Sequence, residues 1–299
     1  MTKNNQPTLL VTGASGHLGR RVVELLLEAE AGTIIATTRT PDKLADFSAR
    51  GVIVRHADFN QPDSLAKAFA GVDRLLLIST DALGESGLRL KQHKTAVKAA
   101  EAAGVSHVIY TSAINPGPGS AIPDHYETEE ALAASQLNWT VLRNNLYADL
   151  LLVSLGQAVQ IGQLFSAAGD GKIAYISRED CAQAAAAALL SSLNGHRTLN
   201  ITGPEALSQT DLANIAAQIA GKPVTYVPLE LDVLIQNMVA AGLPQPAAEL
   251  YASIDSATAR GQFETVSSDF EKLTGSKPTA VAEFLAANQE ALLPEASRQ

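Results

Sequence analysis

Three glycines near the N-terminus constrain the fold more than any other feature of this sequence. They lie in the stretch Val11-Thr12-Gly13-Ala14-Ser15-Gly16-His17-Leu18-Gly19, between an apolar run and a segment of helical periodicity. Gly13 permits a tight turn, Gly16 lets the backbone approach a pyrophosphate, and Gly19 lets the helix pack closely against the strand. The alternative is a plain glycine-rich turn. The strand before the motif and the helix after it favour a dinucleotide site, with phosphates on the free N–H groups of the helix.

Short apolar runs alternate with stretches of helical period through the first half of the chain. The runs are continuously apolar, which is typical of strands covered on both faces of a parallel sheet. Alternation with short connections implies right-handed crossovers, and therefore an α/β fold built on a Rossmann-type doubly wound parallel sheet. The expected strands are Thr8–Val11, Thr33–Thr37, Val52–Arg55, Arg74–Ile78, His107–Tyr110 and Trp139–Leu142, and the expected helices are Leu18–Glu30, Pro41–Ala49, Pro62–Ala70 and Leu88–Ala103.

The second half is less regular and becomes mostly helical. It contains one further expected strand, Thr198–Thr202, and expected helices at Tyr147–Gln160, Glu179–Leu190, Gln209–Ala220, Leu229–Ala241, Ala247–Gly261 and Ala280–Leu292. A chain of 299 residues suits a large domain with a smaller one. We therefore expect residues 1–145 to form an NADP-binding domain, joined by sheet and helix segments around residues 172–203. Residues 146–299 would form mainly a smaller, mostly helical C-terminal substrate lobe.

The end of the second expected strand indicates which dinucleotide is bound. Thr38 and Arg39 stand where an NAD enzyme usually has an acid for the ribose 2′-hydroxyl. A guanidinium beside hydroxyls suits a 2′-phosphate, and Lys43 lies one helical turn further on. NADPH is therefore expected in preference to NADH, against the alternative that Arg39 is a solvated loop residue. Asp58 and Phe59, after the third strand, either border the adenine or simply end that strand.

Together, these motifs resemble the NmrA-like, atypical short-chain dehydrogenase/reductase family. Within that family the likeness is strongest to the branch of quinone oxidoreductase type 2 and triphenylmethane reductase, and it spans nearly the whole chain. The segments that carry it are Gly13–Gly19, the Arg39 loop, His56–Phe59, Leu77–Ser79, Tyr110–Ser112, Leu142–Tyr147, Ala168–Ile173 and Asn200–Gly203.

The proton-transfer pair of standard short-chain dehydrogenases, Tyr-x-x-x-Lys, is missing. Tyr126 is followed four residues later by Glu130. The resemblance implies that the tyrosine position falls on His125 and the lysine position on Glu129. Alcohol oxidation needs a strong positioned base and is disfavoured. Quinone reduction asks for less, because a phenolate-like product, with a conjugate acid of pKa near ~10, is readily protonated by water. Cationic dyes accept hydride without any proton.

Six residues are candidates to surround the nicotinamide: Ser79, Ser112, His125, Arg143, Asn144 and Tyr147. The Asn144 amide would bond the carboxamide or the substrate oxygen, or it caps the next helix. His125 would donate to a developing oxyanion, or it is a loop or first-turn histidine. Tyr147 would line the acceptor pocket, or it is a core tyrosine on a helix face. Ser112 matches the serine that ends the fifth strand in the superfamily, although its tyrosine partner is missing. Ser79 and Arg143 are grouped with the cofactor.

Composition and spacing weigh against other classes of function. The six histidines are scattered, so we expect no metal, and no Gly-x-Ser-x-Gly elbow occurs, so we expect no serine hydrolase. We also expect no flavin. Cys181, the single cysteine, is expected to be a buried packing thiol. A net charge of −9 without a basic block predicts no nucleic-acid partner. No apolar run approaches the ~20 residues of a membrane helix, and Met1–Pro7 is polar, so a cytoplasmic location is expected. Many reductases of the superfamily are dimers, but no helix here shows a clear dimerisation seam, so a monomer or a homodimer is expected.

Two hypotheses about the function are consistent with the sequence. In the first, the protein is an NADPH-dependent reductase that transfers hydride to a quinone or a related flat aromatic acceptor, including triphenylmethane-type dyes. In the second, it is an NmrA-like regulator that senses NADP(H) and binds a protein partner without turnover. The first predicts acceptor-dependent oxidation of NADPH. The second predicts binding alone, with little discrimination between the oxidised and reduced cofactor.

Overall fold

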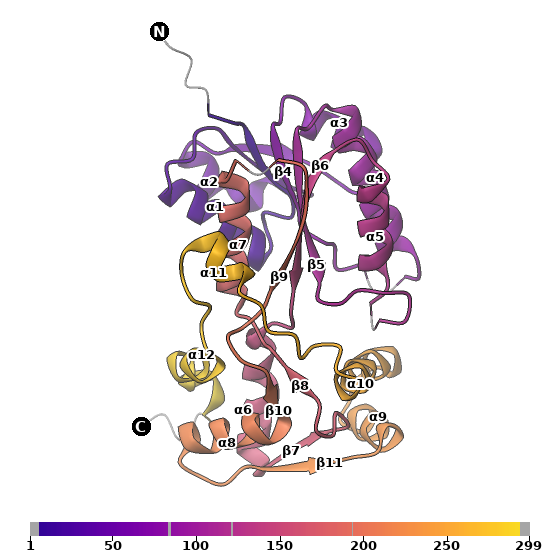
Figure 1. Ribbon diagram of the computed structural model, residues 1–299, viewed down its shortest axis with the longest axis vertical. Helices are drawn as coiled ribbons and strands as arrows, with labels where there is room; N and C mark the ends of the chain where they lie inside the picture. The colour runs from indigo at the N-terminus through magenta and orange to yellow at the C-terminus, as the bar shows by residue number, and fades with distance from the viewer. Residues whose placement is uncertain (1–5, 83–84, 121, 193, 294–299) are drawn as a thin grey trace.

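A seven-stranded sheet, in which all neighbouring strands pair in parallel, forms the centre of the molecule (Figure 1). The computed structural model describes residues 6–82, 85–120, 122–192 and 194–293, so most of the polar stretch Met1–Pro7 lies outside it. The strands run in the order β3-β2-β1-β4-β5-β6-β9. Their bounds are β1 Leu9–Val11, β2 Ile34–Thr38, β3 Ile53–His56, β4 Arg74–Leu77, β5 His107–Ala113, β6 Asn138–Asn144 and β9 His196–Ile201. The predicted doubly wound sheet is confirmed.

Helices cover both faces of this sheet, which explains why its strands are continuously apolar. On β1, Leu9 and Val11 belong to one core and Leu10 to the core on the opposite face. The first core is closed by α1 (His17–Glu28), the 3₁₀ turn η1 (Pro41–Leu44), α2 (Ala45–Ala49), α7 (Arg178–Leu190) and α11 (Asp269–Thr274). The second is closed by α3 (Pro62–Phe69), α4 (Leu88–Ala102) and α5 (Asp124–Ala133).

A smaller, mostly helical lobe lies beyond the carboxyl ends of the strands and has its own apolar core (Figure 1). Two short sheets complete it, one parallel between β7 and β11 and one antiparallel between β8 and β10. Its elements are η2 Ala148–Leu150, α6 Leu151–Ile161, β7 Gln163–Ser166, β8 Lys172–Ile173, β10 Leu207–Ser208, α8 Gln209–Ala220, β11 Thr225–Pro228, α9 Leu231–Ala240, α10 Gln245–Ala259, α12 Val281–Ala287 and α13 Gln289–Leu292.

Several elements differ from those expected. The helix α5 was not predicted. The segment Pro41–Ala49 is divided into a 3₁₀ turn and a short helix, and the helix expected over Ala280–Leu292 is broken at Asn288. The four short strands of the small sheets were also missed. The division into domains at residues 145 and 146 stays a prediction, because segments on both sides of it contribute to the large sheet.

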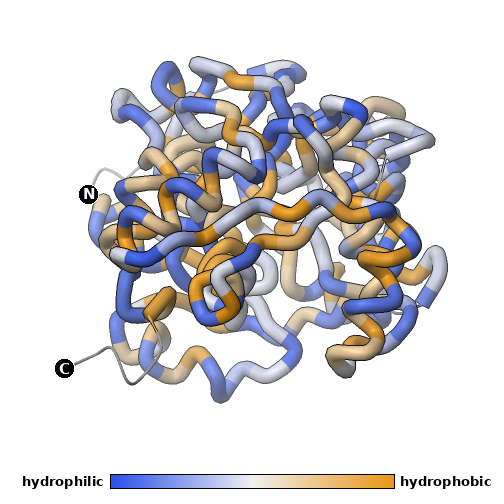
Figure 2. The backbone as a smooth tube through the Cα atoms, turned by 90° about the horizontal axis from the view of Figure 1, so that it is seen from below, coloured by the Kyte–Doolittle hydropathy of each residue, from blue (hydrophilic) through white to orange (hydrophobic). Residues whose placement is uncertain are grey.

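Hydrophilic and hydrophobic residues are interspersed along the backbone, as the alternating colours of Figure 2 show. Within the described ranges, no helix is both long and apolar enough to cross a membrane.

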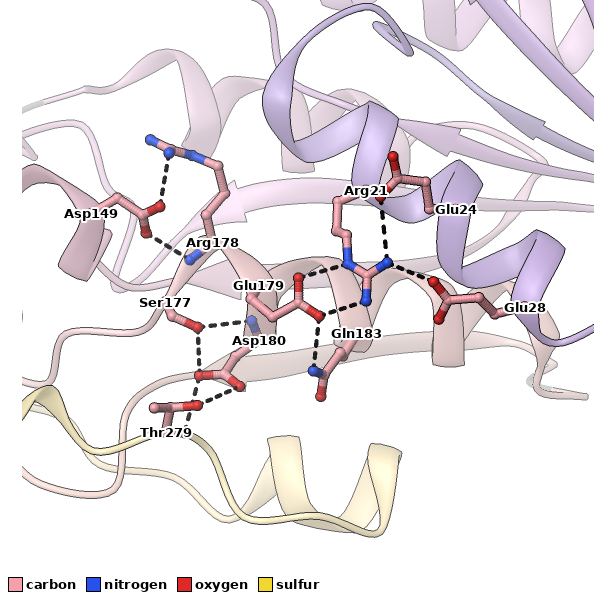
Figure 3. Close-up of polar contacts among 10 residues, drawn as sticks. All are labelled: Arg21, Glu24, Glu28, Asp149, Ser177, Arg178, Glu179, Asp180, Gln183 and Thr279. Carbon is pink, nitrogen blue, oxygen red and sulfur yellow. Dashed lines mark hydrogen bonds and ion pairs between the residues drawn. The ribbon is translucent and has the colours of Figure 1, made fainter. Parts of the chain in front are cut away.

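Polar contacts fix α7 against its surroundings (Figure 3). The Ser177 hydroxyl accepts a hydrogen bond of 2.9 Å from the Asp180 backbone N–H and caps the helix. The buried Asp180 carboxylate also accepts the Thr279 N–H at 3.0 Å, which ties the C-terminal segment to the sheet domain. On the outer side, Glu179 pairs with Arg21 of α1 at 2.7 Å. Cys181 is buried between these helices, and burial raises the pKa of its thiol, as expected of a packing residue.

Candidate functional site

A cavity of about 500 Å³ opens at the carboxyl ends of β1, β2, β3 and β4. This is the edge at which doubly wound sheets bind ligands, beside the point where the strand order reverses. It is lined by Gly13, Ser15, Gly16, His17, Leu18, Gly19, Thr37, Thr38, Arg39, Ala57, Asp58, Phe59, Ile78, Ser79, Thr80, Asp81, Arg89, Gln92, Ile122, Tyr147 and Arg178. Most residues predicted to hold a dinucleotide thus face one continuous space, although Ala14 is buried and does not line it.

The glycine motif forms a cradle for an anion at the start of α1. Gly13 has a φ of +59°, a left-handed conformation that favours glycine. Gly16 stands at the helix N-cap, and no side chain caps the helix there. The first backbone N–H groups of α1 therefore lack a helical partner and face the cavity, as a pyrophosphate requires. A Cβ on Gly19 would lie only 2.5 Å from the Gly13 carbonyl oxygen, so the close approach of helix and loop depends on this glycine.

Hydroxyl groups organise the loop after β2. The hydroxyls of Ser15 and Thr38 lie 2.9 Å apart, and the Thr38 hydroxyl also accepts the backbone N–H of Thr40 at 3.2 Å. The Arg39 side chain is exposed and lines the cavity beside them. Lys43 does not line the cavity; it is exposed, and its carbonyl oxygen accepts a hydrogen bond from Arg20 at 2.9 Å. The geometry thus favours Arg39 over Lys43 as the contact for a ribose 2′-phosphate.

Asp58, Phe59 and Ser79 line the same cavity from the ends of β3 and β4. The Asp58 carboxylate accepts hydrogen bonds from the Asn60 N–H at 2.9 Å and from the Gln61 amide at 3.0 Å, so its position is fixed. The Ser79 N–H donates to the Thr111 hydroxyl at 2.9 Å, which links the ends of β4 and β5.

Tyr147 and Arg178 also line the cavity. The Arg178 guanidinium lies 5.2 Å from the centre of the Tyr147 ring and is held by Asp149 at 2.9 Å, the ion pair drawn in Figure 3. Burial raises the pKa of the Tyr147 hydroxyl, and a nearby hydrogen bond from Asn144 opposes this only partly. Tyr147 is therefore a protonated hydrogen-bond donor at neutral pH.

Ser112 and Arg143 meet at Glu129 rather than at the cavity. The Ser112 hydroxyl donates to the Glu129 carboxylate at 2.5 Å, and Arg143 binds the same carboxylate through two nitrogens, at 2.6 Å for Nη2. Neither Ser112 nor Arg143 is among the lining residues. Asn144 is 6% exposed and also lies behind the lining, with its Oδ1 atom lacking a hydrogen-bond partner among the described residues.

His125 belongs to a buried polar network beneath the cavity floor. Its Nδ1 atom lies 2.9 Å from the Tyr110 hydroxyl, and its Nε2 atom lies 3.2 Å from Nη2 of Arg89. Because arginine can only donate, Nε2 accepts and the proton is on Nδ1. Burial lowers the pKa of His125 well below its usual value, and the positive charge of Arg89 adds to this, so the ring stays neutral.

Arg89 supplies the only guanidinium of the lining that is buried; the side chain is 6% exposed. Its Nε and Nη1 atoms have no hydrogen-bond partner among the described residues. One helical turn further along α4, Gln92 donates to the Asn60 side chain at 3.1 Å, while its own Oε1 atom is unpartnered. Polar groups without partners in a cavity wall are expected where a ligand completes their bonds.

Comparison with known proteins agrees with this geometry: residues 13–192 match the family described as NAD(P)H-binding. The chain belongs to this NAD(P)H-binding, NmrA-like family. Quinone oxidoreductase 2 of Escherichia coli is 36% identical over 92% of this chain and 96% of its own length. The NADPH complex of the Escherichia coli NADPH-dependent quinone oxidoreductase superposes with a TM-score of 0.89 at 35% identity, covering 94% of this chain and all of that one.

A second solved relative is a dye reductase. The Citrobacter sp. triphenylmethane reductase in complex with NADP(H) has a TM-score of 0.87 and 36% identity, over 94% of this chain and 99% of that one. An NAD(P)H azoreductase of Xenophilus azovorans is 29% identical over 95% of this chain and 98% of its own. The resemblance drawn from the sequence motifs is confirmed.

The sequence analysis did not identify Arg89, Gln92 and Arg178 as residues that line the candidate site. Arg178 was missed because it was placed just outside an expected helix. Arg89 and Gln92 are three residues apart on a helix that also carries exposed lysines, which looks like an ordinary solvated face. The available signal was their position directly after the fourth strand, at the edge where the cofactor is expected. Within the described ranges, no three histidine, cysteine or acidic side chains cluster so as to hold a metal ion.

Proposed function

We propose that this protein is an NADPH-dependent reductase that transfers hydride to a quinone or a related flat aromatic acceptor. The observation that carries the proposal is one continuous cavity lined by the anion cradle, by Arg39 and by Tyr147. The activities for which its relatives are named, reduction of quinones, azo compounds and triphenylmethane dyes, share one feature, a conjugated aromatic or quinonoid acceptor.

The residues present fit a dinucleotide phosphate. The uncapped start of α1 and the close contact at Gly19 make a cradle that any larger side chain would fill. Arg39 and the hydroxyls of Ser15 and Thr38 suit a 2′-phosphate, while Asp58 and Phe59 border the adenine. When bound, the cofactor supplies the hydride. We propose that NADPH is preferred over NADH because Thr38 and Arg39 stand at the end of β2, where an NAD enzyme usually has an acid.

The chain's own groups place and shield the acceptor rather than moving a proton. Glu129, at the position of the family's lysine, is committed to Arg143 and Ser112. The neutral His125 uses both ring nitrogens within the buried network. We therefore propose supporting roles for Ser112, His125 and Arg143, and direct contact with the bound molecules for Tyr147, with Asn144 behind it. Water protonates the product, and the C-terminal lobe, residues 146–299, supplies the acceptor side of the pocket.

The proposed function also implies which partners the protein has and where it is located. We propose small aromatic molecules as partners, with no nucleic acid, no membrane, no metal and no flavin, in a cytoplasmic monomer or homodimer.

The test measures NADPH oxidation with and without a panel of small quinones and one cationic triphenylmethane dye, with NADH in parallel. The wild type, Arg39→Ala and Arg50→Ala are compared. Arg50 is a matched control because it is an exposed arginine on the next loop that does not line the cavity. Loss of the charge-assisted bonds at Arg39 should weaken the binding of NADPH about tenfold, the lower end of the range expected for an exposed site. The binding of NADH should stay nearly unchanged.

Three outcomes are informative. Acceptor-dependent oxidation that prefers NADPH, with the preference reduced only in Arg39→Ala, supports the enzyme and its phosphate contact together. An equal loss of NADPH preference in Arg39→Ala and Arg50→Ala would contradict a specific role of Arg39 in binding the 2′-phosphate. Tight NADP(H) binding without oxidation by any acceptor would favour the sensing regulator.

A further inference from the structure

The starting observation is a buried positive charge that the protein itself leaves incompletely bonded. The Arg89 guanidinium lines the cavity and is 6% exposed, yet only its Nη2 atom has a partner, the Nε2 atom of His125 at 3.2 Å. Its Nε and Nη1 donors are buried and unpaired within the described part of the chain. Leaving two donors of a buried cation unbonded is unfavourable, so the arrangement is best explained by a ligand that supplies acceptor atoms.

The fold determines where along the cavity that ligand atom must lie. The anion cradle is at β1 and the 2′-phosphate loop is at β2, so the cofactor must extend from there toward β4, β5 and β6. Arg89 lies on this far side, because it bonds His125 of α5, which in turn bonds Tyr110 of β5 at 2.9 Å. Arg89 is therefore at the reactive end of the site, with Tyr147 and Ile122 among the other lining residues.

The surroundings fix the guanidinium rather than neutralise it. His125 is neutral and can only accept from Arg89, and no described carboxylate forms an ion pair with it. The carboxylates whose charges act on Arg89, Asp124 and Asp81, do so only through longer-range attraction, and Asp81 lines the same cavity. Arg89 also follows Gly87, the residue that caps the start of α4, where the helix dipole adds positive potential. The result is a preorganised positive site facing the cavity.

We infer that Arg89 holds the acceptor oxygen that becomes negatively charged on reduction, and that this charge selects quinone-like acceptors over cationic dyes. The inference rests on the proposed reductase function. Hydride transfer delivers two electrons and one proton to the quinone and oxidises the reduced nicotinamide. It leaves a hydroquinone monoanion, whose second proton comes from water. The free N–H groups of Arg89 bond the phenolate oxygen as its charge develops, which stabilises the transition state.

A cationic triphenylmethane dye gives the opposite prediction. Its central carbon accepts hydride and the product is neutral, so no oxyanion forms for Arg89 to stabilise. The fixed positive charge instead repels the incoming dye. Removing the charge should therefore lower the rate of quinone reduction without lowering the rate of dye reduction. Loss of a purely structural role of Arg89 would lower both rates.

The experiment compares the wild type with Arg89→Met, Arg89→Lys and the control Lys91→Met, an exposed residue on the same helix. Methionine keeps an unbranched apolar stem in the buried position. For neutral quinones, kcat should fall about 10- to 100-fold in Arg89→Met and less in Arg89→Lys, as for loss of one oxyanion donor. The kcat/KM for the cationic dye should stay level or rise, and the Kd for NADPH should not change.

A second readout does not need turnover. 4-Nitrophenol is added to the protein saturated with NADP⁺ and titrated by absorbance, because its phenolate form is coloured. The wild type and Lys91→Met should bind the phenolate and lower the apparent pKa of the bound phenol, and Arg89→Met should not. This measurement stands even if no acceptor is reduced, so failure of the proposed function and failure of the inference are separable. Should Arg89→Met fail to fold, Arg89→Gln, which removes the charge but keeps a polar side chain in the buried position, carries both measurements.

Two results would overturn the inference. If Arg89→Met lowers kcat/KM equally for quinones and for the cationic dye, Arg89 only maintains the structure. If Arg89→Met weakens the binding of NADPH by as much as it lowers the rate, the atom that Arg89 bonds belongs to the cofactor and not to the acceptor.

Discussion

Gly19→Ala tests the central geometric claim about the cofactor site, that close contact between α1 and the glycine loop creates the anion cradle. A Cβ at this position would lie 2.5 Å from the Gly13 oxygen and 2.9 Å from the Ala14 Cα, both backbone atoms that cannot rotate away. Ordinary contact begins near 3.4 Å. The helix must therefore retreat from the loop by roughly 1 Å, which is the kind of overpacking that costs about 1–3 kcal/mol of stability.

The same displacement acts on ligand binding. Hydrogen bonds from backbone N–H groups to phosphate are effective at about 2.9 Å and are largely lost when stretched by another 1 Å. Each such bond to a charged group contributes about 1.5–3 kcal/mol, so loss of a single one would weaken NADPH about 10- to 100-fold. Gly19→Ala should thus lower both the free energy of unfolding and the affinity for cofactor.

Gly16→Ala and Gly117→Ala are matched controls. A Cβ on Gly16 would meet the Gly13 oxygen at 3.4 Å, so the fold should tolerate it, but the added methyl group would enter the cavity. Gly117 has open space around it. Urea unfolding and a fluorescence titration with NADPH should show both losses in Gly19→Ala, loss of affinity alone in Gly16→Ala, and neither in Gly117→Ala. Wild-type stability and affinity in Gly19→Ala would refute the reasoning.

Two further predictions concern stability. Ser177→Ala removes the cap of α7 and a partner of Asp180, so urea unfolding should show a loss of about 1–2 kcal/mol, whereas Ser48→Ala, at an exposed site, should cost little. Burial lowers the pKa of His93 to about 3 and that of His107 to about 4, so the unfolded chain binds protons below pH 6.5 that the folded protein excludes. Stability should therefore be full above pH 6.5 and fall by about 1.4 kcal/mol per pH unit for each histidine as the pH drops toward these folded-state values. Urea unfolding from pH 7 to pH 5 in the wild type and His107→Gln checks this, and an equal slope in both proteins would contradict the part assigned to His107.

The large sheet could be predicted from sequence because its physical signals are local. Strands such as β1 are apolar on both faces, and the glycine motif reports a turn, a ligand contact and a helix contact at once. The helix α5 gave no such signal, because His125 and Thr128 are polar and yet buried, which removes the apolar periodicity. The short strands β8 and β10 exist only as each other's partners, so no property of either segment alone predicts them.

The glycine-motif side of the candidate site could be predicted from sequence for a related reason, because its backbone geometry recurs in doubly wound sheets that bind dinucleotides. Side-chain pairing across long separations could not. An arginine at the end of β6 suits a ligand as well as a protein carboxylate, and only the folded structure shows that Arg143 binds Glu129. Arg89 presents the reverse case, since a helix-start arginine looks solvated until its donors are found buried and unbonded.

The missing tyrosine and lysine are therefore not simply a loss of function in this site. The resemblance implies that the position of the lysine falls on Glu129, which binds Arg143 and Ser112, and that the position of the tyrosine falls on His125, which is buried and bonded to Arg89 and Tyr110. A neutral His125 accepts from Arg89, a lining residue whose Nε and Nη1 atoms have no partner among the described residues. We infer that this site presents the fixed positive charge of Arg89 in place of a proton-transfer pair. Such a charge suits an acceptor that becomes an anion before it takes a proton, because the anion then needs only electrostatic stabilisation until water protonates it.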